Sequence, residues 1–243
     1  MTTCIKVKQP NTKYIDCAHC SMQPICLPLK AGKTSVSIMD SYLSKRNIVN
    51  ISTPLFKIQD AANAIYAVCS GSFKLTETSP EGKERVIGFR FPGELIGEDA
   101  IHTETHKYNA IAIGNTTVCR VDLAELIECG KLVPELQFNL ILLLSRQNTM
   151  LREEFSSVVA KHTAESLLAA FILNMLKRNA HYQESAVKLH LPVGRDVIAN
   201  HLGFRRETLS RIFSKFQHKG LLAIQAKNIE ILNLEKLEDV AYN

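Results

Sequence analysis

The feature that most constrains the fold of this chain is the stretch 134–178, which contains no glycine or proline after its opening Pro134. Glycine and proline are the usual interruptions of helices, so this stretch predicts two long helices with at most a brief break between them. Short apolar runs with turns between them precede it, and a block bearing Lys and Arg follows it. This order predicts a β-rich domain, a long helix and a helical C-terminal domain.

Short runs with the composition of β-strands fill the region before the long helices. They are 65–71, 72–78, 85–91, 108–113 and 116–121. Turn signals separate them, among them Ser79-Pro-Glu-Gly82 and Pro92-Gly93. Several short strands at this spacing are typical of an antiparallel barrel or jelly roll. We therefore predict an α+β protein that begins with an antiparallel β-roll.

The first long helix carries a repeat at alternating spacings of four and three residues, which is typical of a seam between two helices. Its members are Leu136, Leu140, Leu143, Gln147, Met150, Glu154 and Ser157. The alternative is a helix that only packs on the β-roll. We favour a homodimer seam, because Leu142 and Leu144 leave a second apolar face for the β-roll.

Glu154 is predicted to be a dimer switch, together with Met150, Leu143 and Leu140 on the same seam. A twofold axis through the seam would bring two Glu154 carboxylates together. Repulsion between like charges would then keep the protein largely monomeric until the binding of a ligand offsets it.

The helix that begins near Thr163 is predicted to be amphipathic. Its apolar face consists of Leu167, Leu168, Phe171, Ile172, Met175 and Leu176. A short strand is expected at 187–191, after which residues 194–216 have the pattern of a helix-turn-helix, with Gly203 permitting the turn. The predicted buried residues are Val197, Ile198 and Leu202 on the first helix and Leu209, Ile212, Phe213 and Phe216 on the second.

The second helix of this motif is a predicted DNA reader. The residues expected to face outward are Arg205, Arg206, Glu207, Ser210, Arg211 and Lys215. Arg suits guanine, Glu accepts from the cytosine amino group, and Ser serves either role. The net charge of the chain is +5, and residues 161–243 hold 12 Lys and Arg against 8 Asp and Glu. A pair of helices with solvated charges is the alternative, but residues 221–231 also read as a two-stranded wing, which favours double-stranded DNA as partner.

Four cysteines form a candidate ligand set. Three stand close together as Cys17, Cys20 and Cys26, and the fourth is Cys119. Four thiols can complete a site for a metal or for an iron–sulfur cluster. The chain has 7 cysteines, and its first residues lack the apolar stretch of a secretory signal. Metal or thiol chemistry is therefore favoured over a disulfide framework.

The remaining composition bounds the class of protein. The chain is 46% hydrophobic and 22% charged, which is typical of a globular protein. No apolar run approaches the roughly 18 residues that a membrane span needs, so we expect a cytoplasmic protein that does not contact membranes. The predicted segments are 1–30 for the cysteine-rich part, 31–130 for the β-roll, 131–160 for the dimerisation helix and 161–243 for the winged helix-turn-helix.

These motifs together resemble the FNR-type branch of the CRP/FNR superfamily of bacterial transcription regulators. The resemblance spans nearly the whole chain. It includes the C-x2-C-x5-C run, Thr116-Thr-Val-Cys119, Gly93-Glu-Leu-Ile-Gly97, Ala164-Glu-Ser-Leu-Leu-Ala-Ala-Phe171 and Glu207-Thr-Leu-Ser210-Arg211. The cysteine run and the Glu-x-x-Ser-Arg reader are specific in combination.

The resemblance implies an oxygen-sensing regulator with one [4Fe–4S] cluster held by Cys17, Cys20, Cys26 and Cys119. It also implies an inverted repeat of TTGAT-type half-sites read by Glu207, Ser210 and Arg211. Activation further implies a contact with RNA polymerase, for which the turn at 79–85 is a candidate. A four-thiolate zinc site, or thiol-redox sensing by the same cysteines, is the alternative.

Two departures from the superfamily affect these expectations. Relatives that bind cyclic nucleotides hold the phosphate with an Arg-Ser or Arg-Thr pair, whereas the corresponding stretch here is Lys107-Tyr-Asn-Ala110. One flexible Lys supplies only a point charge, so no cyclic nucleotide is expected. Arg205 and Arg206 give the reader a more cationic start, which would either add phosphate contacts or shift the preferred half-site.

Other polar and thiol residues are given ordinary roles. His102 and His106 have an i, i+4 spacing but are interpreted as surface histidines. Cys69 is expected in the core, and no role is assigned to Cys4 or Cys129. An enzyme is not predicted, because the β region lacks a His and Glu ligand set and the chain shows no nucleophile–base arrangement.

Overall fold

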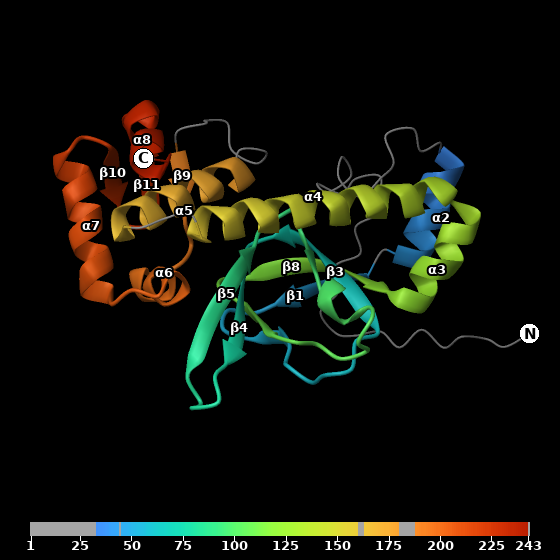
Figure 1. The fold of residues 1–243 in the computed structure, drawn as a ribbon. Helices are drawn as coiled ribbons and strands as arrows, with labels where there is room; N and C mark the ends of the chain where they lie inside the picture. Colours follow the sequence, from blue (N-terminus) through green and yellow to red (C-terminus); the bar gives the residue numbers. More distant parts are fainter. Residues whose placement is uncertain (1–32, 44, 160–162, 180–187, 243) are drawn as a thin grey trace, which may run out of the picture. The chain divides into compact units, whose positions relative to one another are not determined.

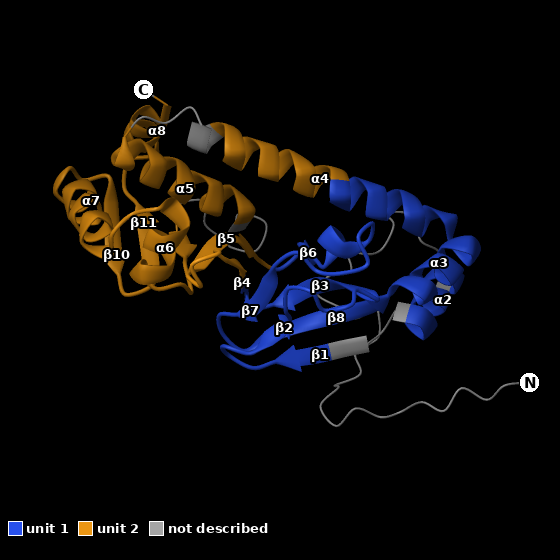
Figure 2. Ribbon diagram, turned by 60° about the horizontal axis from the view of Figure 1, so that its bottom comes forward, with its two compact units in different colours: residues 1–73, 92–144 blue, residues 74–91, 145–243 orange. Residues whose placement is uncertain are grey.

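The computed structural model describes residues 33–43, 45–159, 163–179 and 188–242. The chain divides into two compact units, drawn in blue and orange in Figure 2. The first contains residues up to 73 and 92–144, and the second contains 74–91 and 145–243. Helix α4 (Pro134–Val159) begins in the first unit and ends in the second. The segment 74–91 therefore joins the unit that carries the predicted DNA reader.

The first unit is built on antiparallel strands (Figure 1). One sheet has the order β1 (Lys45–Val49), β8 (Thr116–Asp122), β3 (Ala64–Ser70) and β6 (Leu95–Ile96). A second pairing joins β2 (Pro54–Phe56) to β7 (Asn109–Ala112). The strands predicted at 65–71, 108–113 and 116–121 are confirmed, and so is the antiparallel β-roll.

Two helices pack beside the sheet of β8. Helix α2 (Lys33–Leu43) contacts both α3 (Leu123–Leu132) and β8. Their core contains Met39, Cys129, Val133 and Leu136, with Val121 of β8 packed against it. Cys129 is fully buried there, and burial raises the pKa of its thiol. Cys129 is therefore part of the hydrophobic core, and Cys69 on β3 is buried as predicted.

The second unit begins with the hairpin of β4 (Phe73–Thr78) and β5 (Glu84–Arg90). Its turn is closed by the N–H of Ser79, which donates to the carbonyl oxygen of Lys83 at 2.9 Å. Gly82 has a φ of 77°, a conformation that glycine adopts without strain. The predicted strands at 72–78 and 85–91 and the turn between them are confirmed.

Helix α5 (Ala164–Asn179) is central to the second unit. It begins at a reciprocal cap in which the N–H of Ser166 donates to Thr163 Oγ1 at 3.0 Å and the N–H of Thr163 donates to Ser166 Oγ at 3.3 Å. The prediction of a one-sided helix is only partly right, because Ala169, Ala170 and Leu173 are buried as well. The reason is that α7 (Arg206–His218), α8 (Leu234–Tyr242) and β9 (Lys188–His190) all contact α5.

The C-terminal part forms a winged helix-turn-helix, as predicted. Helices α6 (Arg195–Leu202) and α7 (Arg206–His218) follow the expected strand β9. The wing consists of β10 (Leu222–Gln225) and β11 (Asn228–Ile231), and β11 also pairs with β9. The sequence did not predict α2, α3, α8, β1, β2, β6 or the short 3-10 helix Glu98–Ala100. Among the described helices, none has the length and apolar character required to cross a membrane.

Candidate nucleic-acid interface and ligand residues

The turn of the helix-turn-helix is fixed by the backbone at Gly203. Gly203 has a φ of 74°, and its N–H donates to the carbonyl oxygens of Ala199 and Asn200 at the end of α6. The N–H of Phe204 donates to the carbonyl oxygen of Ala199 at 2.8 Å. A glycine in the left-handed region after the last helical residue satisfies the terminal carbonyls of a helix. This geometry ends α6 and directs the chain into α7.

Helix α7 has one buried and one exposed face. Leu209, Ile212, Phe213 and Phe216 are buried, as the sequence predicts. Arg205, Arg206, Glu207 and Arg211 are exposed, and Ser210 is half-buried. The outward face of α7 is therefore cationic, and it also presents the carboxylate of Glu207 and the hydroxyl of Ser210. Such a face offers donors and acceptors to base edges and charge to phosphates.

Two further cations lie beside this face, held by contacts that no local sequence pattern predicts. The guanidinium of exposed Arg195, at the start of α6, lies 5.4 Å from the centre of the Phe213 ring. Lys215 was expected to face outward; it is exposed and forms an ion pair with Glu165 of α5. A cation on an aromatic face is held in place without a counter-charge. Arg195 therefore adds positive charge next to the reader.

Cys119 is the one member of the four-cysteine set within the described residues; Cys17, Cys20 and Cys26 lie outside them. It occupies the middle of β8, an interior strand, opposite Ala67 of β3. Because side chains alternate along a strand, Cys119 shares its side with Val121, which packs toward α2 and α3. It is half-buried. No group of three or more possible metal ligands occurs in the part of the chain that the structure describes.

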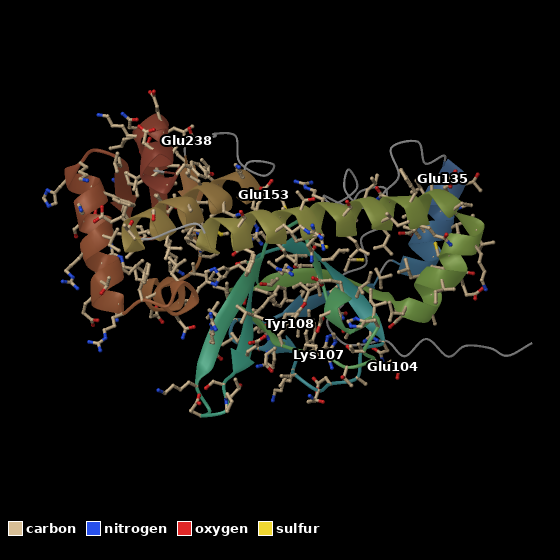
Figure 3. All side chains as sticks on the ribbon, viewed as in Figure 1. Glu104, Lys107, Tyr108, Glu135, Glu153 and Glu238 are labelled. Atoms are coloured by element: carbon tan, nitrogen blue, oxygen red, sulfur yellow. The ribbon has the colours of Figure 1, made fainter. Side chains whose placement is uncertain are left out.

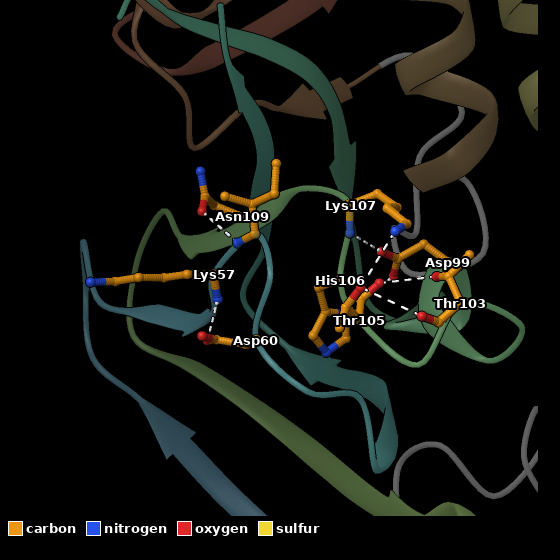
Figure 4. Close-up of polar contacts among 9 residues, drawn as sticks. Lys57, Asp60, Asp99, Thr103, Thr105, His106, Lys107 and Asn109 are labelled. Carbon is orange, nitrogen blue, oxygen red and sulfur yellow. Dashed lines mark hydrogen bonds and ion pairs between the residues drawn. The ribbon is translucent and has the colours of Figure 1, made fainter.

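The loop before β7 is closed by its own polar contacts (Figure 4). The carboxylate of Asp99 accepts the N–H of Lys107 at 2.8 Å and lies 3.3 Å from His106 Nδ1. The His106 ring stacks on Phe56 at 3.5 Å between centres. His102 is exposed as predicted, but the prediction of a surface position for His106 is wrong, because only 2% of it is exposed.

Lys107 and Tyr108, labelled in Figure 3, belong to the stretch that the resemblance aligns with the Arg-Ser or Arg-Thr pair of relatives that bind cyclic nucleotides. Lys107 is exposed and its Nζ lies 3.4 Å from Thr105 Oγ1, whereas Tyr108 is buried and its ring lies 5.7 Å from that of Phe56. The backbone N–H of Lys107 already donates to the carboxylate of Asp99, so it is not available to a phosphate.

The residues of α4 that were predicted to form the seam are buried or half-buried within the single chain. Leu136 and Gln147 are buried, while Leu140, Leu143, Met150 and Glu154 are half-buried. Three exposed apolar residues, Ile141, Leu151 and Phe155, lie one position further along the same repeat, with half-buried Leu144 and exposed Asn148 between them. Phe138 and Leu142 are exposed on α4 as well but lie outside this repeat. We call Ile141, Leu144, Asn148, Leu151 and Phe155 the α4 stripe. The predicted seam is not tested by a single chain.

Glu154 is paired within its own subunit. Its carboxylate lies 3.3 Å from His201 Nε2 and 3.8 Å from Arg178 Nη1. Burial raises the pKa of this carboxyl, but the hydrogen bond with His201 and the charges of Arg178, His201 and Arg90 outweigh burial and lower it. The predicted role as a dimer switch stays a prediction.

Comparisons with family models and curated proteins agree with this geometry. Residues 168–240 match the model of the Crp-like helix-turn-helix domain, and residues 50–131 match that of the cyclic nucleotide-binding domain. The chain is 31% identical to the transcriptional activator protein Anr of Pseudomonas protegens, over 96% of this chain and 94% of that protein. It is 33% identical to the anaerobic regulatory protein of Haemophilus influenzae, over 92% of this chain and 86% of that protein.

Solved structures share the fold. FixK2 of Bradyrhizobium japonicum matches with a TM-score of 0.65 and 22% identity, over 80% of this chain and 96% of that one. A mutant of CooA from Carboxydothermus hydrogenoformans matches with a TM-score of 0.68 and 19% identity, over 89% and 95%. The curated relatives named above are regulators rather than enzymes. This chain is therefore a transcription regulator with a DNA-binding helix-turn-helix, and it belongs to the CRP/FNR family.

Proposed function

We propose that this regulator responds to oxygen and binds its DNA sites as a homodimer when oxygen is absent. Relatives that share about a third of its residues are named anaerobic regulatory protein and transcriptional activator protein Anr. The sensor is the four-cysteine set, and the output is the exposed face of α7. The protein acts in the cytoplasm, where its DNA is.

The position of Cys119 carries the sensor part of this proposal. Cys119 lies on an interior strand beside α2, whose first residue is Lys33. Cys26 precedes Lys33 by seven residues, a length that spans at most about 25 Å when extended. This short link limits how far Cys26 can lie from the start of α2, and we propose that it lets Cys26 approach Cys119.

Cys17, Cys20, Cys26 and Cys119 together would hold a [4Fe–4S] cluster. Four thiolates are the donor set that such a cluster takes, and a bound cluster would supply a centre that oxygen destroys. The chain's own part is to bring an N-terminal loop and a rigid strand together. Loss of the cluster would release the N-terminal loop from β8. The alternative remains zinc or thiol-redox sensing by the same residues, because zinc takes the same four thiolates.

Purification without oxygen tests the cluster directly. We expect a brown protein with about four iron and four sulfide per chain, bleached by air. Cys119→Ser should lose the iron, whereas the matched variant Cys4→Ser, at a cysteine without an assigned role, should keep it. A colourless protein that contains one zinc per chain would support the alternative instead.

The DNA part of the proposal assigns a TTGAT-type inverted repeat to the two α7 helices of a dimer. Glu207, Ser210 and Arg211 read base edges, while Arg205 and Arg206 contact phosphates. Two such helices reach successive major grooves about one helical turn apart. A monomer lacks the second half-site, so its specific binding is far weaker.

We assign the dimer contact to the α4 stripe. Ile141, Leu151 and Phe155 are 61%, 45% and 71% exposed, a large apolar surface for one helix. Their spacing with Leu144 and Asn148 alternates three and four, the repeat of a helix pair, and a polar Asn within such a seam fixes its register. Glu154 lies next to the stripe and pairs within the subunit.

Two further partners follow from the surface. The tip of the β4–β5 hairpin, around exposed Glu81 and Lys83, is our candidate contact for RNA polymerase. No cyclic nucleotide is proposed as effector, because the Asp99 carboxylate 2.8 Å from the Lys107 N–H would repel a phosphate. Titration calorimetry with cyclic AMP should therefore give no heat of binding.

A further inference from the structure

His201 lies between two acceptors of the second unit. Its Nδ1 is 3.2 Å from the carbonyl oxygen of Val86 on β5. Its Nε2 is 3.3 Å from Glu154 Oε1 on α4. His201 itself belongs to α6, the first helix of the helix-turn-helix. One side chain therefore joins the reader to a strand and to the long helix.

Both ring nitrogens need a proton to make these contacts. A backbone carbonyl oxygen accepts and never donates, and an ionised carboxylate does the same. A neutral imidazole carries one N–H and one lone pair, so it satisfies one acceptor and turns the lone pair toward the other. An imidazolium donates to both. Both contacts, with Val86 and with Glu154, form together only when the ring carries the second proton.

The surroundings favour an ionised Glu154 opposite the ring. Arg178 of α5 lies 3.8 Å from the carboxylate and donates from Nη2 to the Phe89 carbonyl oxygen at 2.7 Å. Arg90 of β5 adds a further positive charge near Glu154. The ring of His201 is flanked by Phe89 at 5.1 Å and Phe171 at 5.6 Å. Because its side chain is only 11% exposed, water cannot readily replace a lost partner.

We propose that His201 is a protonation-dependent latch that holds the helix-turn-helix against α4 and β5. With two protons it donates to Val86 and to Glu154 at once. When the pH rises and one proton is lost, a lone pair faces an acceptor and one of the two contacts opens. The latch therefore holds the reader in position while the ring carries both protons and loosens it when one of them is lost.

The latch acts independently of the proposed cluster, because its groups all belong to the second unit. It links α4, which carries the proposed dimer stripe, to the helix that precedes the reader. A rise in pH would thus weaken operator binding even in a protein whose sensor is intact. His201 is a positioning residue, since it lies on α6 rather than on the exposed face of α7.

Glu154→Gln is the sharpest variant for a test. The glutamine amide can donate an N–H to Nε2, so a neutral ring keeps both contacts. Thermal unfolding of the full chain is followed from pH about 6 to about 8.5. We expect the midpoint of the wild type to fall by about 2–4 °C more than that of Glu154→Gln over this range, the scale of one lost hydrogen bond. His218→Gln, at an exposed position on α7, should behave like the wild type.

Nitrogen-15 NMR of the imidazoles gives an independent readout. At pH about 8.5 the ring-nitrogen signals of His201 should differ between the wild type and Glu154→Gln, because the carboxylate and the amide offer a neutral ring different partners, while those of His218 should be the same in both. If Glu154→Gln does not fold, His201→Gln takes its place, and its midpoint should lack the fall seen in the wild type. Equal pH profiles of unfolding for the wild type and the variant used, or His201 ring signals that are identical with and without the Glu154 carboxylate, would overturn the proposal.

Discussion

Asn200 on α6 binds the backbone of β5 as a neighbouring strand would. Its Oδ1 accepts the N–H of Val86 at 2.6 Å, and its Nδ2 donates to the carbonyl oxygen of Glu84 at 3.0 Å. β5 is the last strand in its sheet order, so these backbone groups would otherwise face water. This amide therefore makes two of the hydrogen bonds that hold the β4–β5 hairpin to the helix-turn-helix.

Replacing Asn200 with Ala should loosen this attachment. Two hydrogen bonds are lost, each of which contributes about 1 kcal/mol at a partly exposed position. We expect the midpoint of urea unfolding to fall, corresponding to about 1–2 kcal/mol, with faster amide exchange at Val86. The matched variant is Gln217→Ala, an amide truncation at an exposed position of α7. Equal stability of the two variants would contradict the role given to Asn200.

An element of this fold can be predicted from the sequence when the residues that indicate it lie in one short stretch of the chain. The strands at 65–71 and 116–121 and the helices around Gly203 were predicted because their pattern and their turns are contiguous. Strands such as β2 and β6 have three and two residues, too few for alternation to show. The hairpin joins the second unit through Asn200, His201 and Arg178, and no local pattern announces contacts between residues so far apart in the chain.

The seam of α4 shows a second limit. Leu140, Leu143 and Met150 and their successors Ile141, Leu144 and Leu151 follow the same alternation of three and four residues. Periodicity identifies the repeat, but it does not tell which of two adjacent stripes the rest of the protein covers. Exposure distinguishes them, since Leu136 and Gln147 of the first stripe are buried. The cysteines at 17, 20 and 26 lie outside the described residues, so their grouping with Cys119 stays a prediction.

Substitutions on α7 should separate base reading from phosphate binding. Arg211→Ala should weaken binding to a TTGAT-type inverted repeat by about 1–3 kcal/mol and leave binding to a scrambled duplex nearly unchanged. Arg205→Ala should weaken both duplexes alike and reduce the slope of log affinity against log salt by about 1. Fluorescence anisotropy at several salt concentrations measures both quantities. An Arg205→Ala protein that altered only the specific complex would assign Arg205 to base reading instead.

Glu154 should also make stability depend on pH on the acid side. Its pKa is lower in the folded protein than the ordinary value of 4.5, because the contacts with His201, Arg178 and Arg90 outweigh its burial. A depressed acid contributes stability that is fully present above its unfolded pKa and is lost as the pH falls through the folded value. Unfolding by urea should thus show a steeper loss of free energy below pH about 4.5 in the wild type than in Glu154→Gln. If the free energies of unfolding of the two proteins fall in parallel at acid pH, the contacts with His201, Arg178 and Arg90 do not lower the pKa of Glu154.

The α4 stripe can be tested by placing a charge in it. Leu151→Glu or Phe155→Glu puts two like charges next to each other across a twofold axis and removes apolar surface from the contact. We expect either variant to be monomeric in analytical ultracentrifugation under anaerobic conditions in which the wild type dimerises, with a dissociation constant raised at least about tenfold, the effect of about 1.4 kcal/mol. Glu153, labelled in Figure 3, is exposed on the same helix but outside the stripe, so Glu153→Lys is the matched charge change and should leave the dimer intact. If Met150→Glu dissociates the dimer while Leu151→Glu does not, the seam is the covered stripe that the sequence predicts, and α4 must then turn that face toward its partner.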